Sequence, residues 1–177
     1  MARYQTSNNS GLRIRKMTSA ALMVALSAVG AFIKIPGPLG TIALDSCPGY
    51  LYASLYGSFG GAVVAFFGHL ASAVTVGFPL GIPIHLVVAA EMGLCAAVYG
   101  WIGRGVLSKS SWTLACLVAV LLNGVGAPLV LLPWLGIRAA IPLVLPLLIA
   151  SSINVAAAIL AFRILNPRVN PGGTHHL

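Results

Sequence analysis

Long apolar stretches, separated by Gly, Pro and charged residues, are the feature that most limits what this chain can fold into. Of its 177 residues, 59% are hydrophobic and 7% are charged, and the mean hydropathy is +0.98. A water-soluble domain of this length carries roughly a quarter charged residues. Asp45 and Glu91 are the only acids. The pattern therefore predicts an integral membrane protein that is surrounded mainly by lipid.

The spacing of the apolar stretches predicts an all-α bundle of six membrane helices. A bilayer core of about 30 Å requires about 20 apolar residues per helix. The expected helices cover residues 16–35, 45–57, 61–76, 83–102, 112–132 and 139–164. The second and third are short, so we expect them to lean on their neighbours or to lie partly outside the hydrocarbon.

Proline and polar residues define the expected connection between the first two helices. Pro36-Gly37-Pro38 ends the first helix, because proline lacks the N–H donor and clashes with the preceding turn. The connecting turn extends to Thr41. Asp45 or Ser46 then begins the second helix, since either side chain can accept a hydrogen bond from the first helical turn.

The same pattern predicts one membrane domain with two short flanking segments. Residues 1–15 form a basic N-terminal segment, residues 16–165 the six-helix domain, and residues 166–177 a polar, disordered tail. The first apolar stretch follows basic residues, as in a signal peptide. It lacks a convincing small-residue cleavage site, so we interpret it as a retained helix.

The distribution of Lys and Arg predicts the orientation of the bundle. Cytoplasmic loops of membrane proteins are enriched in these residues. One side of the predicted bundle carries Arg3, Arg13, Arg15, Lys16, Arg104, Lys109, Arg163 and Arg168, and the other carries Lys34 and Arg138. Both termini are therefore expected in the cytoplasm.

Several function classes have no support in the sequence. The basic residues lie between apolar spans rather than on one accessible face, so nucleic acid is not an expected partner. The chain lacks the G-x-x-x-x-G-K-[ST] loop, so energy from ATP would have to come from a partner protein. No motif of a hydrolase or metalloprotease is present, and Cys47, Cys95 and Cys116 show no metal-ligand spacing. We expect no enzyme activity, no metal and no cofactor.

The two acids are the first candidates for a binding site, because ionisable residues are costly in a membrane. Asp45 begins the second predicted helix at the outer surface and is equally suited to bind a polar ligand or to cap the helix. Glu91 lies eight residues beyond Pro83, roughly 12 Å along its helix. It is a candidate for ligand binding, or else a protonated carboxyl that packs helices.

Four further polar residues lie within predicted spans. His69 is halfway along the third helix and His85 is near the outer end of the fourth. A rotation of roughly 120° separates His85 from Glu91, so both could flank one cavity. Asn123 is in the middle of the fifth helix, and Asn154 occupies a similar position in the sixth. Hydrogen bonding between helices is the simpler role for both amides and for His69.

The first predicted helix carries small residues on one face. Ala21, Ala25 and Ala28 form a stripe that would allow another helix to approach closely. Alanine is common in membrane helices, so this stripe alone does not define a partner.

The first helix also resembles a known family. The segments Ala21-Leu-Met-Val-Ala25 and Val29-Gly-Ala-Phe-Ile-Lys-Ile-Pro36 are similar to the opening of S components, the substrate-binding subunits of energy-coupling-factor (ECF) vitamin transporters. The resemblance extends over nearly the whole chain. It implies that Ala21 and Ala25 dock on a transmembrane coupling subunit driven by two cytoplasmic ATPases, in a bacterial cell membrane.

Within that family, two runs resemble the group assigned to α-ribazole, a cobalamin precursor (CblT). They are Gly40-Thr-Ile-Ala-Leu-Asp-Ser-Cys-Pro-Gly-Tyr50 and Gly77-Phe-Pro-Leu-Gly-Ile-Pro-Ile-His85, together with Glu91. Gly30 to Pro36 is closer to biotin S components. The resemblance implies an outward-facing cavity lined by Asp45, His69, His85, Glu91 and Asn123, and an aromatic ring for the ligand to stack on, such as Tyr50 or Phe78.

Two other functions remain open on the residues alone. In a stand-alone secondary carrier, Glu91 and His69 would form a proton relay. In a structural or assembly protein, Ala21 and Ala25 would serve only for helix packing.

Overall fold

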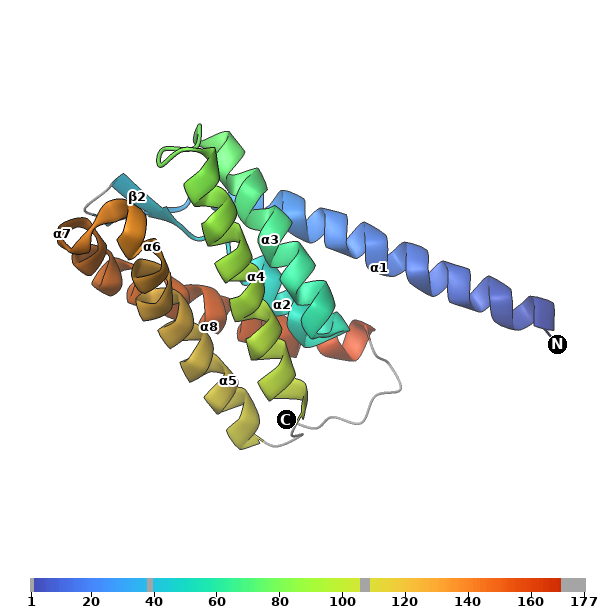
Figure 1. Cartoon of the computed structure of the whole chain (residues 1–177). Helices are drawn as coiled ribbons and strands as arrows, with labels where there is room; N and C mark the ends of the chain where they lie inside the picture. The colour runs from blue at the N-terminus through green and yellow to red at the C-terminus, as the bar shows by residue number, and fades with distance from the viewer. Residues whose placement is uncertain (1, 38–39, 106–108, 170–177) are drawn as a thin grey trace.

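The chain forms a bundle of helices with one small β-hairpin. The computed structural model describes the backbone of residues 2–37, 40–105 and 109–169. Long helices α1 (Ala2–Gly30), α3 (Ser58–Thr75), α4 (Ile82–Gly105) and α8 (Val144–Val169) dominate it, with the shorter α2 (Cys47–Tyr56) among them (Figure 1). In the described residues the architecture is helical apart from the hairpin of β1 (Lys34–Gly37) and β2 (Gly40–Ala43).

The fifth and sixth predicted helices are each composed of several consecutive segments. The fifth consists of α5 (Lys109–Leu121), a π-helical turn η1 (Leu122–Gly126) and α6 (Ala127–Leu135). The sixth consists of α7 (Ile137–Ala140), a 3₁₀ turn η2 (Ile141–Leu143) and α8. The 3₁₀ turn contains Pro142, which lacks the N–H that an α-helix would need there.

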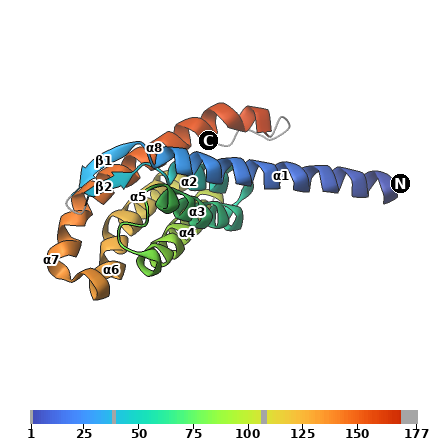
Figure 2. The same cartoon turned by 90° about the horizontal axis from the view of Figure 1, so that it is seen from above.

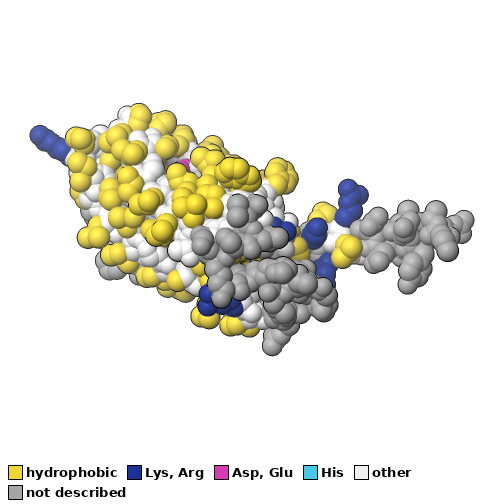
Figure 3. Space-filling view, turned by 90° about the horizontal axis from the view of Figure 1, so that it is seen from below, with side chains coloured by type: hydrophobic (Ala, Val, Ile, Leu, Met, Phe, Trp, Pro, Cys, Tyr) yellow, Lys and Arg dark blue, Asp and Glu magenta, His cyan; other side chains and the backbone are white. Residues whose placement is uncertain are grey.

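Four helical segments of the described chain are long and apolar enough to cross a membrane. They cover Ser58–Thr75, Ile82–Arg104, Ser111–Leu135 and Ile137–Asn166. On the face shown in Figure 3, hydrophobic side chains cover much of the body, whereas Lys and Arg lie toward its ends. The prediction of an apolar helical bundle is confirmed. Six crossings stay a prediction, because α2 has only 10 residues, about 15 Å of helix, which is too short to span the bilayer core. The location of both termini in the cytoplasm also stays a prediction.

The hairpin replaces the turn that was expected after the first helix. The helix ends at Gly30, not at Ile35, and the backbone N–H of Leu44 donates to the carbonyl of Ile33 over 3.0 Å. A side chain at Gly30 would collide with the carbonyl oxygen of Leu44. The prediction of helix up to Ile35 was therefore wrong, because the returning strand packs against the end of α1.

Helices extend into both flanking segments. Residues 2–15 continue α1 as helix, and this part projects away from the bundle (Figure 2). At the other end, α8 continues through Asn166 to Val169, beyond the predicted start of the tail. Residues 170–177 lie outside the described residues, so the expected disorder there stays a prediction.

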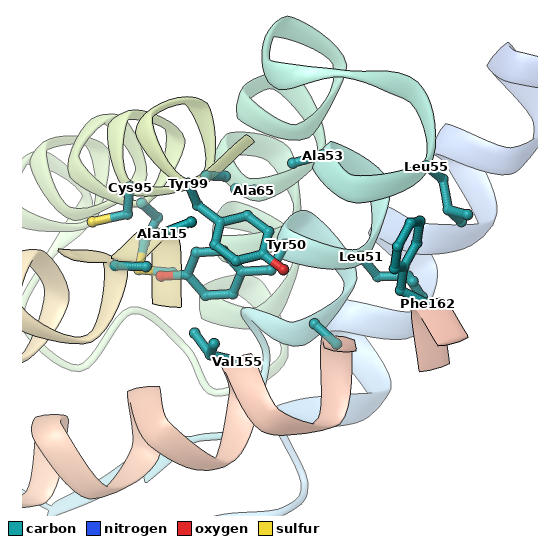
Figure 4. Packing of buried hydrophobic residues seen from close by; sticks show 14 residues of the cluster. Tyr50, Leu51, Ala53, Leu55, Ala65, Cys95, Tyr99, Ala115, Val155 and Phe162 are labelled. Carbon is teal, nitrogen blue, oxygen red and sulfur yellow. The ribbon is translucent and has the colours of Figure 1, made fainter. Parts of the chain in front are cut away.

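The core lies where α2 packs against α3, α4 and α8, and α5, which packs on α4 and α8, completes it. Tyr50 of α2 and Tyr99 of α4 meet edge to face with ring centroids 5.2 Å apart (Figure 4). Small residues allow the backbones to approach, as is typical of membrane helices. A Cβ at Gly49 would lie 2.7 Å from the Cβ of Ala65, so α2 and α3 are in close contact.

Candidate functional site

A group of polar side chains lies between α2, α3, α4 and the π-helical turn. We call it the polar cluster; its members are Asp45, Tyr50, His69, His85, Glu91, Cys95 and Asn123. Asp45 precedes α2, His69 lies in α3, and His85 and Glu91 lie in α4. Asp45, His85 and Asn123 are buried at 8%, 7% and 5% exposure. Such burial in an apolar bundle is costly unless polar groups satisfy one another or a ligand.

Asp45, His69 and His85 form a chain of direct contacts. Asp45 Oδ2 lies 3.5 Å from His69 Nδ1, and His69 Nε2 lies 3.2 Å from His85 Nδ1. The two imidazole rings are stacked, with centroids 5.4 Å apart. The alternative of Asp45 as a helix cap is not supported, because α2 begins after Ser46 without a side-chain cap. The structure thus brings together three residues that the sequence placed on three different segments.

Glu91 points into the same region from the next turns of α4. The Cys95 thiol donates a hydrogen bond to Glu91 Oε1 over 2.8 Å, one helical turn along. Glu91 also lies within electrostatic range of His69. The sequence analysis did not include Cys95 in the site. Its spacing of four residues from Glu91, which places both side chains on one helix face, could have indicated it.

Tyr50 and Asn123 complete the cluster on the side of the core. The Tyr50 side chain lies near those of Glu91, Cys95 and Asn123. Asn123 occupies the π-helical turn, where the widened backbone re-aims side chains; such turns occur frequently at functional sites. Tyr50 is 1% exposed and its ring packs on Tyr99, so its hydroxyl, not its ring face, is oriented toward the cluster.

Phe78 covers His85 from the turn between α3 and α4. The two rings meet edge to face with centroids 5.5 Å apart. Phe78 has a φ of 50°, a left-handed conformation that costs a non-glycine residue roughly 1–2 kcal/mol. Its N–H donates to the Ala73 carbonyl over 3.0 Å, and its carbonyl accepts from Gly81 N–H over 2.8 Å. These bonds hold the ring beside the histidine.

Asn154 is in a different position from the polar cluster. Its Oδ1 accepts a hydrogen bond from the Cys47 backbone N–H over 2.8 Å, which matches the role in helix packing expected for this amide. The described residues contain no group of three or more His, Cys, Asp or Glu side chains that could hold a metal ion.

Ala21 and Ala25 lie on an exposed face of α1. The helix contacts the body through other small residues: Ser27 is 1% exposed, and a Cβ at Gly68 of α3 would lie 2.6 Å from its Oγ. The exposed alanines are therefore not used for packing within this chain.

A polar cluster inside an apolar helical bundle is typical of membrane proteins that bind or transport a ligand. The sequence model of the family "ECF transporter, substrate-specific component" matches residues 15–167, so the chain belongs to this family. Membership implies a small-molecule substrate and an ECF module as partner. The family is a class of transporter subunits, not of enzymes.

Comparison with solved structures supports the same fold. The S component of a bacterial ECF transporter superposes with a TM-score of 0.66 at 20% sequence identity, covering 89% of this chain and 98% of that one. At this identity the similarity supports the fold and not the ligand. Comparison with curated proteins gave no match.

Proposed function

We propose that this chain captures a small vitamin or vitamin precursor outside a bacterial cell and delivers it inward after docking on an ECF module. The observation that carries the proposal is the convergence of Asp45, His69, His85 and Glu91 from separate segments of an apolar bundle. A structural protein would have no evident need to bring four ionisable side chains together inside an apolar bundle.

The proposed ligand is α-ribazole, and biotin or another vitamin is the alternative. The ribose hydroxyls of a nucleoside can donate to Glu91 and bond with His85, while Asn123 and the Tyr50 hydroxyl offer further polar contacts. Phe78 is half-buried beside His85 and is the aromatic ring best placed to contact a benzimidazole. Tyr50 would contribute its hydroxyl only, since its ring belongs to the core.

The proposed docking surface on α1 contains Ala21 and Ala25. Both are exposed, and Leu22 and Leu26 beside them are 64% and 50% exposed. Small side chains permit close approach of a helix from the transmembrane coupling subunit. In this proposal two cytoplasmic ATPases drive that subunit, and the chain spans the plasma membrane several times with both termini in the cytoplasm.

Binding by the purified full-length protein tests the ligand site. We expect detergent-solubilised protein to bind α-ribazole in calorimetry, and Glu91→Gln to bind about tenfold or more weakly, since a hydrogen bond to a charged group contributes about 1.5–3 kcal/mol. Ser152→Ala is the matched control, because Ser152 is exposed and bonds only within its own helix. Absence of binding to α-ribazole, biotin and other vitamins would contradict the proposal.

A proton-coupled carrier is the second candidate, favoured by the direct His69–His85 contact next to Asp45. Proteoliposomes distinguish the two. Uptake that requires a co-reconstituted ECF module and ATP supports the first proposal. Uptake by this chain alone, driven by a proton gradient and lost in His69→Gln, supports the carrier.

A further inference from the structure

Unpartnered buried atoms are concentrated in the polar cluster. Of four such side-chain atoms among the described residues, three are His85 Nε2, Glu91 Oε2 and the Tyr50 hydroxyl. Leaving a buried polar group without a hydrogen bond costs about 1–3 kcal/mol, so nearly all find a partner. His85 and Tyr50 are 7% and 1% exposed. These atoms are the places where polar groups of a ligand would complete the hydrogen bonding.

The direction of the hydrogen bonds toward His85 can be derived from Asp45. An ionised carboxylate only accepts hydrogen bonds, so the facing nitrogen, His69 Nδ1, carries a hydrogen. In its neutral form His69 has one N–H and one lone pair, so its Nε2 is then an acceptor. In that form the nitrogen 3.2 Å away, His85 Nδ1, donates to it. The remaining nitrogen, His85 Nε2, is left with a lone pair and no partner.

We propose that Asp45 and His69 are positioning residues that hold His85 in its Nδ1–H tautomer, so that His85 Nε2 accepts a hydrogen bond from an O–H or N–H group of the ligand. The inference rests on the proposed function and adds which partner donates in the hydrogen bond between His85 and the ligand. Asp45 and His69 thereby act through His85 and need not contact the ligand.

The same arrangement defines the chemical class of the ligand. The members of the polar cluster that can carry charge near neutral pH are two acids and two imidazoles, and the unpartnered atom of His85 is an acceptor. A ligand carboxylate or phosphate would bring negative charge next to Asp45 and Glu91 and acceptors next to an acceptor, which is unfavourable in a medium of low dielectric constant. The site therefore fits a neutral, hydroxyl-rich molecule such as a nucleoside and disfavours an anion such as biotin.

The tautomer can be measured without any ligand. The experiment uses full-length protein labelled with ¹⁵N-histidine in detergent micelles, at about pH 8, where an ordinary imidazole is mainly neutral. NMR then gives one pair of ring-nitrogen chemical shifts for each histidine. Replacing His175 and His176 with Ala leaves His69 and His85 as the two histidines. The pair of signals that disappears in His69→Gln belongs to His69, and the other pair belongs to His85. We expect His85 protonated at Nδ1 and not at Nε2. In Asp45→Asn the constraint is lost, because an amide can donate as well as accept, and the Nε2–H form should appear.

A hydrogen on Nε2 of His85 in the protein with Asp45 and His69 intact would overturn the proposal, whether or not any ligand binds. A correct tautomer combined with no binding of any vitamin would instead contradict only the proposed function. An Asp45→Asn protein that binds more weakly but keeps the wild-type tautomer would also overturn the positioning role, since Asp45 would then act by another route.

Binding to matched probes tests the ligand class. We expect the 5′-phosphate ester of α-ribazole to bind about tenfold or more weakly than α-ribazole itself, equivalent to about 1.4 kcal/mol. In His85→Asn no acceptor remains at the position of Nε2, and the affinity for α-ribazole should fall about tenfold. In His85→Gln the longer side chain places an amide at that position, and most of the affinity should be retained. Equal or tighter binding of the phosphate ester would overturn the assignment of a neutral ligand.

Discussion

Asn154 of α8 accepts a hydrogen bond from the backbone N–H of Cys47, the first residue of α2, over 2.8 Å. The first N–H groups of a helix have no partner within it, and Ser46 provides no side-chain cap here. Asn154 also donates from Nδ2 to the Ala150 carbonyl over 2.9 Å, which holds the amide in place. Because Asp45 and Tyr50 lie beside this helix start, α8 contributes to positioning the polar cluster.

Removal of this cap should destabilise the protein. In Asn154→Leu the part-buried N–H of Cys47 loses its acceptor, and we expect the free energy of unfolding to fall by about 1–3 kcal/mol. Thermal unfolding in detergent should show a lower Tm and weaker binding of α-ribazole. Ser152→Ala, two residues away but exposed, should leave both unchanged. An unchanged Tm in Asn154→Leu would show that another group satisfies Cys47.

Close packing between α2 and α3 predicts opposite effects for two Gly→Ala substitutions. Alanine at Gly49 would place its Cβ 2.7 Å from the Cβ of Ala65, so we expect destabilisation of about 1–3 kcal/mol. At Gly126 the nearest atom is 4.0 Å away, at Leu122, and alanine should be neutral or stabilising by roughly 0.5–1 kcal/mol. Unfolding measurements of both variants check the contrast, which fails if the two substitutions shift Tm alike.

Bulky residues on the exposed face of α1 should block docking without affecting capture. Ala21→Trp combined with Ala25→Trp is expected to abolish co-purification with an ECF module and ATP-dependent uptake. Affinity for the ligand should change less than about twofold, since neither alanine belongs to the polar cluster. Ala157→Trp on α8, also an exposed alanine, is the control. Normal uptake by the double variant would exclude this face as the docking surface.

Cysteine accessibility tests the predicted orientation. With Cys47, Cys95 and Cys116 replaced by Ala, a single cysteine at Arg138 should react with a membrane-impermeant maleimide on intact cells, because Arg138 is exposed in the predicted outer turn. A cysteine at Ser10 or Thr174 should react only after the membrane is opened. Labelling of a cysteine at position 10 on intact cells would show that the N-terminus lies outside and would contradict the predicted orientation.

Local patterns were sufficient to predict most of the helices. The fourth was predicted at residues 83–102 and observed as Ile82–Gly105, and α2 begins within two residues of the predicted start. Gly and Pro end such segments through local backbone geometry, which is why the sequence indicates them. The hairpin was not predictable in this way, since the end of α1 at Gly30 depends on the carbonyl of Leu44, fourteen residues further along the chain.

The sequence by itself determined that this chain lies in lipid, that it is helical, and which few polar side chains are candidates for a site, because hydropathy and charge scarcity are properties of composition and order alone. The tertiary structure decided how those candidates combine. Asp45, His69 and His85 come into contact only when α2, α3 and α4 pack, and Cys95 and the π-helical turn at Asn123 join them only in that arrangement. Distances between side chains on different helices depend on packing, which local sequence patterns do not encode.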